Sequence, residues 1–219
     1  MEADFWNKRW ERGEISFHQS QVNPALVQHL SRLDLAKASR IFLPLCGKTL
    51  DIEWLLAQDH RVVGAELSSL AIDELFASLD LKPVITPIGA LARYSAKNID
   101  IWVGDIFDLS RGILGRVDAI YDRAALVALP KEMRDRYTTH LILLTHTAPQ
   151  LLITYEYNQQ AYDGPPFSVH AEELQRHYDG NYRLELLAHS QIEGGFKGKV
   201  EATTNTWLLK RTDPTPQAL

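Results

Sequence analysis

Short apolar runs alternate with helix-like segments along most of this chain. Runs with the length and composition of buried strands lie at residues 40–45, 61–66, 99–103, 117–121 and 151–155. Segments of helical character lie at 24–33, 49–58, 69–79, 131–144 and 171–179. This alternation predicts an α/β fold with a doubly wound, mostly parallel sheet and helices on both of its faces.

The pattern changes near residue 83 and again toward the C-terminus. Two runs at 182–190 and 201–210 are separated by a glycine-rich segment, which predicts an antiparallel pair at the edge of the sheet. Prolines and a glycine between 83 and 89 predict a loose connection with one short strand near 83–86. We expect a single domain over 1–219, with a cover and helix at 1–34, the core at 35–211 and a flexible tail at 212–219.

Composition narrows the kind of partner. The 219 residues are 45% hydrophobic, which suits one domain with an ordinary core, and the net charge of −5 disfavours nucleic acid and anionic membranes as partners. The sequence has no secretory signal and no apolar span of membrane length, and its single Cys46 cannot form an internal disulfide. We therefore expect a monomeric, soluble, cytoplasmic protein that acts on small molecules.

Two strand ends carry the features of a site for a nucleotide-like cofactor. The run at 40–45 stops at Gly47, where a helix follows, and the run at 61–66 ends in the carboxylate of Glu66. In such sites a glycine lets the backbone approach the ligand, and an acid at the next strand tip accepts both ribose hydroxyls. The same features also occur in βαβ units that bind nothing.

The glycine content of this loop separates the cofactor classes. Gly47-Lys48-Thr49 matches the end of a phosphate-binding P-loop, but position 42, where that motif requires glycine, is Phe42. A dinucleotide site needs G-x-G-x-x-G, and only Gly47 of that pattern is present. S-adenosylmethionine has no pyrophosphate and demands less of the turn, so the loop favours S-adenosylmethionine.

Further chemical groups are expected at the same edge of the sheet. They are Asp105 and Ile106 after one strand, Asp122 and Arg123 after the next, and the Gly-Pro-Pro-Phe loop at 164–167. Because the carboxyl ends of parallel strands share one edge, we expect these groups to converge with Glu66.

The segment before the first strand is rich in aromatic residues, among them Phe5, Trp6, Trp10 and Phe17, and it is interrupted by Gly13. Such a segment either packs on the outside of the domain or covers the site as a lid. As a lid, its aromatic faces would shield a cation and exclude water.

Several motifs together resemble the thiopurine S-methyltransferases, and the bacterial members in particular, over about residues 5 to 210. The motifs are Trp-Asn-Lys-Arg-Trp at 6–10, Phe-His-Gln at 17–19, Phe-Leu-Pro-Leu-Cys-Gly-Lys at 42–48, Val-Val-Gly-Ala-Glu at 62–66, Asp-Ile-Phe-Asp-Leu at 105–109, Tyr-Asp-Arg-Ala-Ala-Leu at 121–126 and Gly-Pro-Pro-Phe at 164–167. The combination of Pro-Leu-Cys-Gly-Lys with Asp-Arg-Ala-Ala-Leu is specific to this resemblance.

The resemblance implies a class I methyltransferase with a seven-stranded, Rossmann-like sheet and S-adenosylmethionine as cofactor. It also implies detoxifying methylation of thiopurines and other small thiols or thiones, and of selenium or tellurium compounds. By motif position, the cofactor contacts are Trp10, Leu45, Glu66, Asp105, Ile106 and Arg123. Arg123 is also the candidate catalytic residue, and Phe17 lies against the acceptor. His18 is either an acceptor-side hydrogen-bonding group or an ordinary surface histidine.

The expected chemistry needs few special groups. Methyl transfer from a sulfonium to a thiolate is an in-line displacement, so alignment and exclusion of water supply most of the catalysis and no metal is required. Arg123 would favour an anionic acceptor, or else form a structural ion pair with Asp122 or a nearby acid. Cys46 is interpreted as a packing residue. The alternative functions are methylation of a different acceptor, a non-catalytic cofactor-binding module and a P-loop nucleotidase.

Overall fold

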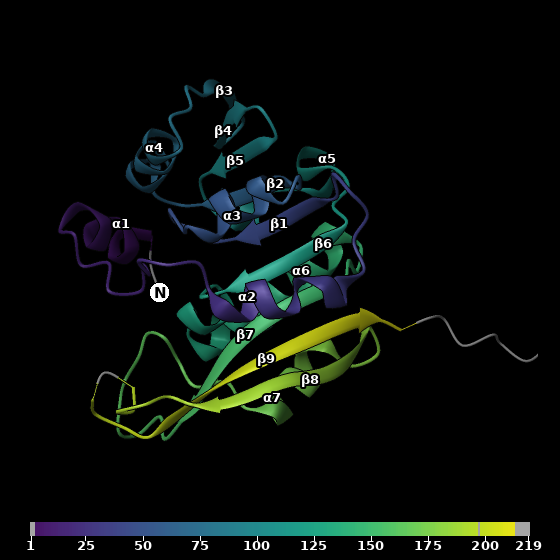
Figure 1. The fold of residues 1–219 in the computed structure, drawn as a ribbon. Coiled ribbons are helices and arrows are strands. Elements are labelled where there is room, and N and C mark those ends of the chain that lie inside the picture. The colour runs from purple at the N-terminus through teal and green to yellow at the C-terminus, as the bar shows by residue number, and fades with distance from the viewer. Residues whose placement is uncertain (1–2, 197, 213–219) are drawn as a thin grey trace, which may run out of the picture.

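The computed structural model describes residues 3–196 and 198–212, whose strands form one nine-stranded sheet (Figure 1). The strands are β1 (Arg40–Pro44), β2 (Arg61–Glu66), β3 (Val84–Ile88), β4 (Leu91–Ala96), β5 (Ile99–Val103), β6 (Ala119–Arg123), β7 (Gln150–Tyr157), β8 (Tyr182–Gln191) and β9 (Ala202–Arg211). Their spatial order is β3-β4-β5-β2-β1-β6-β7-β9-β8. The central strands β5, β2, β1, β6 and β7 run parallel, and antiparallel strands complete both edges. The expected α/β class and the antiparallel C-terminal pair are confirmed.

The sheet has two strands more than the expected seven, because the segment expected to be a loose connection with one short strand is a hairpin. β3 and β4 pair with each other, and β4 continues the sheet next to β5. Proline is tolerated in β3 because this strand forms the edge of the sheet and needs fewer backbone donors. β4 has only two buried side chains, those of Leu91 and Tyr94, so its sequence lacks the apolar run of a core strand.

Helices cover both faces of the sheet. They are α1 (Ala3–Glu11), α2 (Pro24–His29), α3 (Asp51–Ala57), α4 (Ser69–Ser78), α5 (Arg111–Leu114), α6 (Lys131–Thr145) and α7 (Ala171–Tyr178). The described residues also include three short 3-10 helices, η1 (Leu30–Leu33), η2 (Ile106–Asp108) and η3 (Leu126–Ala128). Apolar side chains of α2, α3 and α4 pack with one face of the sheet, and those of α5, α6 and α7 with the other. Along β1, the side chains of Ile41 and Leu43 pack on the side of α2, α3 and α4, and that of Phe42 packs on the side of α5, α6 and α7. Successive side chains of a strand point to opposite faces of the sheet, which explains this alternation.

The side chain of Ser68 caps α4 by accepting a hydrogen bond from the backbone N–H of Ala71. Two local details differ from the sequence prediction. The predicted helix at 24–33 passes into a 3-10 turn at Leu30. β6 extends through Asp122 to Arg123, so the guanidinium is carried by the last residue of a strand and not by a loop.

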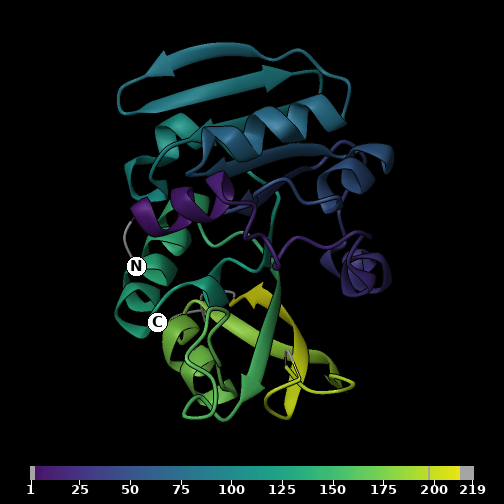
Figure 2. The same ribbon diagram turned by 90° about the vertical axis from the view of Figure 1, so that its left-hand side faces the viewer.

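The N-terminal cover lies over the carboxyl ends of the parallel strands. Figure 2 is viewed toward this edge, and α1 crosses in front of the strand ends there. Of the predicted tail at 212–219, only Thr212 falls within the described residues. No helix in residues 3–196 and 198–212 is long and apolar enough to cross a bilayer.

Candidate active site

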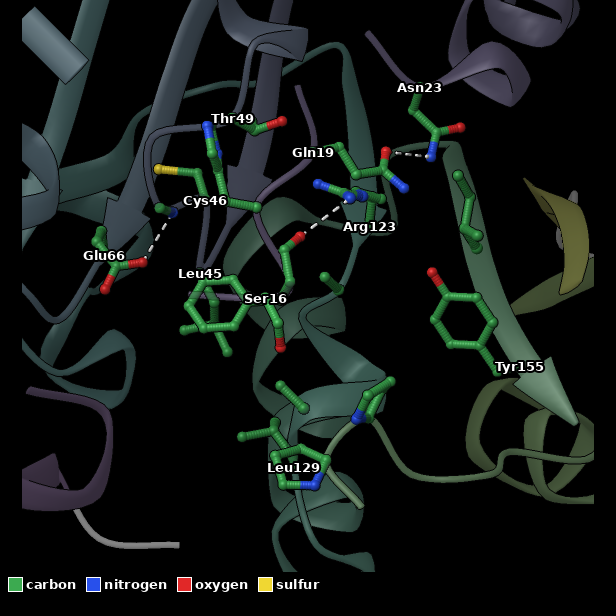
Figure 3. A pocket seen from close by; sticks show the side chains of 18 of the residues that line it. Ser16, Gln19, Asn23, Leu45, Cys46, Thr49, Glu66, Arg123, Leu129 and Tyr155 are labelled. Carbon is green, nitrogen blue, oxygen red and sulfur yellow. Dashed lines mark hydrogen bonds between the residues drawn. The ribbon is translucent and has the colours of Figure 1, made fainter. Parts of the chain in front are cut away.

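A cavity of about 670 Å³ lies at the carboxyl edge of the parallel strands, and side chains of α1 line part of it. Its size is that of a typical small-molecule or cofactor site. The eight residues that the resemblance assigned to the site all line it, namely Trp10, Phe17, His18, Leu45, Glu66, Asp105, Ile106 and Arg123. Asp122, which was expected to converge with them, does not line it. Figure 3 shows Glu66 and Leu45 on one side of the cavity, Tyr155 on the other, and Arg123 between them. The structure brings these residues together around one space, and their roles stay predictions.

The backbone is strained where two central strands enter the cavity wall. Leu45 after β1 has a φ of 47° and Ala124 after β6 has a φ of 64°, both in the left-handed region that residues with a Cβ rarely adopt. Such conformations cost about 1–3 kcal/mol each and persist where the surrounding structure enforces them, often at ligand sites. Both residues line the cavity, so the strain coincides with the site.

Glu66 is the last residue of β2, and its carboxylate is hydrogen-bonded to the loop after β1 and to the loop after β2. Its Oε2 accepts a hydrogen bond of 2.8 Å from the N–H of Gly47, and its Oε1 accepts bonds of 2.9 Å from Leu67 and Ser68. Glu66 is buried at this strand tip and is only 6% exposed. Burial raises its pKa, and the three N–H donors oppose that rise by stabilising the carboxylate. Oε2 retains a lone pair for a ligand hydroxyl.

Lys48 would be the phosphate-binding lysine of a P-loop, but its ammonium contacts other side chains of the protein. Its ammonium forms an ion pair with the carboxylate of Glu74 on α4 and lies 5.9 Å from the ring centroid of Trp10. A P-loop lysine must reach the phosphates of its nucleotide, and this one is directed to α4. The geometry therefore disfavours a nucleotide phosphate at this loop.

The aromatic cover packs directly on the glycine turn. A Cβ on Gly47 would lie 3.1 Å from the indole of Trp10, so the absence of a side chain at 47 lets the ring approach. Trp10 is buried, and its ring meets that of Phe17 edge to face with centroids 5.4 Å apart. Trp6 contacts the same Phe17 ring at 5.7 Å. These rings form a wall of the cavity and not only an outer layer of the domain.

With residues 3–196 and 198–212, Arg123 forms none of the ion pairs that were one of its two expected roles. Its Nη2 donates a bond of 3.3 Å to the carbonyl of Phe17, and its buried Nε has no hydrogen-bond partner in the part of the chain described. Asp122 points to the opposite face, where it accepts bonds from the hydroxyl of Tyr137 at 2.7 Å and the N–H of Leu126 at 3.1 Å. Burial raises the pKa of Asp122 to about 6. The guanidinium is therefore not neutralised by its neighbour.

Asp105 and Ile106 form the rim and floor near the end of β5. The carboxylate of Asp105 caps η2 by accepting a bond of 2.9 Å from the N–H of Phe107, and this residue is exposed and lines the cavity. Ile106 and Leu129 are buried and add apolar surface. An exposed acid beside apolar side chains suits a flat heterocycle that carries hydrogen-bond donors on its edge.

His18 belongs to the cavity wall and is half-buried. Burial lowers its pKa, as do the positive charges of Lys48 and Arg123, while Glu74 opposes them. A lowered pKa favours the neutral imidazole, which both donates and accepts hydrogen bonds.

The thiol of Cys46 is buried against the backbone of β2. A Cβ on Gly64 would lie 2.8 Å from its Sγ, so the thiol occupies space that only glycine leaves free. Burial and the nearby Glu66 raise the pKa of this thiol well above its ordinary value. The reactive species is the thiolate, so this environment opposes a nucleophilic role.

We expect Cys46→Ser to retain most methyl-transfer activity, because donor and acceptor react directly without a covalent enzyme intermediate. Steady-state rates and cofactor affinity of the variant measure this, and the native thiol should resist iodoacetamide until the protein unfolds. Loss of turnover with intact cofactor binding would instead support a nucleophilic cysteine.

Several cavity residues were not identified from the sequence. Among them are Asn23 and His29 of the α2 region, Leu129, Tyr155 and Phe196. The signal for Tyr155 was present, because it lies near the carboxyl end of β7 just as Glu66 ends β2. Phe196 follows two glycines in the β8–β9 connection, a position with no functional pattern.

The central strand order, the glycine turn after β1 and the acid ending β2 define a class I S-adenosylmethionine-dependent methyltransferase. A methyltransferase of this kind from Anabaena variabilis superposes with a TM-score of 0.65 at 16% identity, covering 96% of this chain and 95% of that one. The 1,6-didemethyltoxoflavin-N1-methyltransferase of Burkholderia thailandensis superposes with a TM-score of 0.63 at 13% identity, covering 95% and 87%. These two similarities establish the shared fold.

Comparisons of the amino-acid sequence identify the family to which the chain belongs. The family model described as thiopurine S-methyltransferase matches residues 1–211. A thiopurine S-methyltransferase of Xanthobacter autotrophicus is 51% identical over 212 residues, covering 96% of this chain and 100% of that relative. Another, of Teredinibacter turnerae, is 50% identical over 211 residues, covering 96% and 98%. The chain belongs to the thiopurine S-methyltransferase family, its methyl donor is S-adenosylmethionine, and the P-loop alternative is wrong.

Proposed function

We propose that this protein methylates the sulfur of thiopurines and of other small heteroaromatic thiols or thiones. The observation that carries this proposal is the guanidinium of Arg123 in a cavity with aromatic walls, without a carboxylate partner among the described residues. A desolvated cation beside apolar rings suits a flat acceptor that reacts as an anion.

The cofactor end of the cavity comprises the tips of β1, β2 and β5. Glu66 has acceptor capacity for the ribose hydroxyls, and Asp105 and Ile106 flank the adenine. Leu45 and Trp10 close the cavity around the methionine part, with Trp10 covering Gly47. Bound S-adenosylmethionine supplies an electrophilic methyl group.

The acceptor end lies between Arg123 and the aromatic walls. Phe17 packs against the acceptor ring, and its backbone carbonyl holds Arg123 in place through the bond of 3.3 Å. The cation of Arg123 lowers the pKa of the acceptor thiol and so raises the fraction of thiolate. His18 offers a neutral donor or acceptor at the same wall. Exclusion of water by Trp10 and Phe17 strengthens these electrostatic effects.

We further propose that the protein is a cytoplasmic monomer that detoxifies small nucleophiles, including selenium and tellurium compounds. Soft selenium and tellurium anions share the low basicity and polarisability of thiolates, so one cationic, water-excluding site suits all three. The net charge of −5 supports small molecules and not nucleic acid as the partner.

An acceptor panel tests the proposed function. The native protein should methylate 6-mercaptopurine and thiophenol much faster than hypoxanthine or phenol, which replace sulfur with oxygen. Product identity by mass spectrometry should place the methyl group on sulfur. Preferred methylation of nitrogen or oxygen would show that the acceptor class is different.

Arg123→Met should reduce turnover more for an acceptor that must ionise in the site than for one already anionic at neutral pH. Loss of a charge-assisted interaction costs about 1.5–3 kcal/mol, which is at least about a tenfold loss of kcat/KM for the first acceptor. The pH dependence of kcat/KM for two acceptors of different thiol pKa measures the difference. Arg111→Met on the surface of α5 is the control and should leave kcat/KM unchanged for both acceptors. Equal losses for both acceptors would restrict Arg123 to positioning.

A further inference from the structure

The far wall of the cavity is made by strands of the C-terminal third, to which no function is assigned above. Tyr155 lies near the end of β7, opposite Glu66, and its ring extends into the cavity on the side of Arg123 (Figure 3). Phe196, from the β8–β9 connection, lines the same space. The rings of Tyr155 and Phe196 meet edge to face with centroids 5.3 Å apart.

Backbone geometry fixes Phe196 at this wall. Its N–H donates a bond of 2.6 Å to the carbonyl of Val200, which closes a turn between β8 and β9. Gly195 precedes it with a φ of 72°, and a Cβ there would lie 2.4 Å from the carbonyl oxygen of Val200. The turn therefore requires glycine at 195, and this requirement sets the position of the Phe196 ring.

The ring of Phe196 contacts the rings of Tyr155, Tyr157 and Tyr162, whose hydroxyls differ in their surroundings. The hydroxyl of Tyr157 donates a bond of 2.6 Å to the carbonyl of Pro166, and that of Tyr162 a bond of 3.2 Å to the carbonyl of Pro165. Tyr157 and Tyr162 thus hold the proline loop in the cavity wall. The hydroxyl of Tyr155 points into the open space instead, with no hydrogen bond to another described residue (Figure 3).

The phenol of Tyr155 is suited to donate a hydrogen bond. Burial raises its pKa, and the nearby charge of Arg123 only partly opposes this, so the hydroxyl keeps its proton at neutral pH. A protonated phenol offers one O–H donor to an anionic ligand. Arg123 and Tyr155 therefore present two donors to one part of the cavity.

We infer that Tyr155 determines acceptor specificity by donating its hydroxyl to a ring nitrogen of a heteroaromatic thiolate whose ring packs against Phe196. The inference rests on the proposed function and names the acceptor class more closely. When such a thione loses its proton, both its sulfur and the adjacent ring nitrogen become hydrogen-bond acceptors. Arg123 and Tyr155 then bind the two ends of one N–C–S unit, which fixes the direction of the sulfur lone pair.

The test compares 2-mercaptopyridine with thiophenol, which differ by one ring nitrogen. We expect Tyr155→Phe to lower kcat/KM for 2-mercaptopyridine about tenfold, as for loss of one hydrogen bond to a charged group, and to change that for thiophenol by less than about twofold. Calorimetry with S-adenosylhomocysteine should give native affinity for the variant, since Tyr155 lies away from the cofactor end.

Tyr157→Phe is the matched control, because it removes a hydroxyl from the same cluster that is bonded to Pro166. It should affect both acceptors equally. Equal losses for the two acceptors in Tyr155→Phe, with native cofactor binding, would overturn the assignment of Tyr155 alone. Absence of transfer to either acceptor by the native protein would overturn the proposed function and this inference with it.

Discussion

Deletion of residues 1–19 should leave a folded domain that binds S-adenosylmethionine weakly and has almost no methyltransferase activity. The deletion removes the rings of Trp10 and Phe17 from the cavity wall, and with Phe17 the carbonyl that holds Arg123. Misplacement of reacting groups by about 1 Å can cost a hundredfold in rate, so we expect at least about that loss of kcat/KM. The fold should survive, because neither buried cluster around the sheet includes a side chain from residues 3–19.

Circular dichroism and steady-state rates on the truncated protein measure this result. In the full chain, Trp10→Ala should reproduce part of the loss, whereas Glu11→Ala at an exposed position of the same helix should not. Hydrogen exchange within residues 5–20 should slow when S-adenosylhomocysteine binds, because contacts with the ligand offset the entropy of ordering the segment. Failure of the truncated protein to fold, or slow exchange without ligand, would make this segment a fixed part of the core.

Glu66→Ala should weaken S-adenosylmethionine binding and also lower the stability of the protein. Each hydrogen bond from a ligand hydroxyl to a carboxylate contributes about 1.5–3 kcal/mol, so affinity should fall at least about tenfold. Stability should fall because the N–H groups of Gly47, Leu67 and Ser68 lose their acceptor. The structure adds the second effect, which an exposed acid would not have produced.

Calorimetry and thermal unfolding together separate the two effects of Glu66. Ser68→Ala is the matched control, because it removes the cap of α4 without altering a residue that lines the cavity. It should lower the unfolding temperature and leave cofactor affinity unchanged. Native affinity in a folded Glu66→Ala variant would remove Glu66 from the cofactor site.

The sequence predicted the edge of the sheet where the site lies, because parallel strands deliver their carboxyl ends to one side. That rule alone grouped Glu66, Asp105 and Arg123 around one cavity. The rule could not predict how deeply each side chain is buried or which groups it is hydrogen-bonded to. The carboxylate of Glu66 accepts hydrogen bonds from N–H groups of two loops. The carboxylate of Asp122 is bonded to the hydroxyl of Tyr137 on α6 and not to Arg123. Such partners come from separate elements and leave no local pattern.

The far wall was missed for a related reason. Its position depends on β9 pairing with both β7 and β8, which brings Phe196 beside Tyr155 across more than forty residues of chain. The hairpin β3–β4 was missed because its strands carry few buried side chains at an exposed edge. In both cases tertiary pairing, and not the periodicity of the sequence, decides the structure.

The central claim is that one cavity holds the methyl donor and an aromatic sulfur acceptor in contact. Interligand nuclear Overhauser effects, measured with S-adenosylhomocysteine and 6-mercaptopurine on the native protein, test this directly. We predict cross-peaks between the side-chain methylenes of the homocysteine part and the purine protons, and their loss in Arg123→Met. Binding of both ligands without any cross-peak between them would place the acceptor in a different site and contradict the claim.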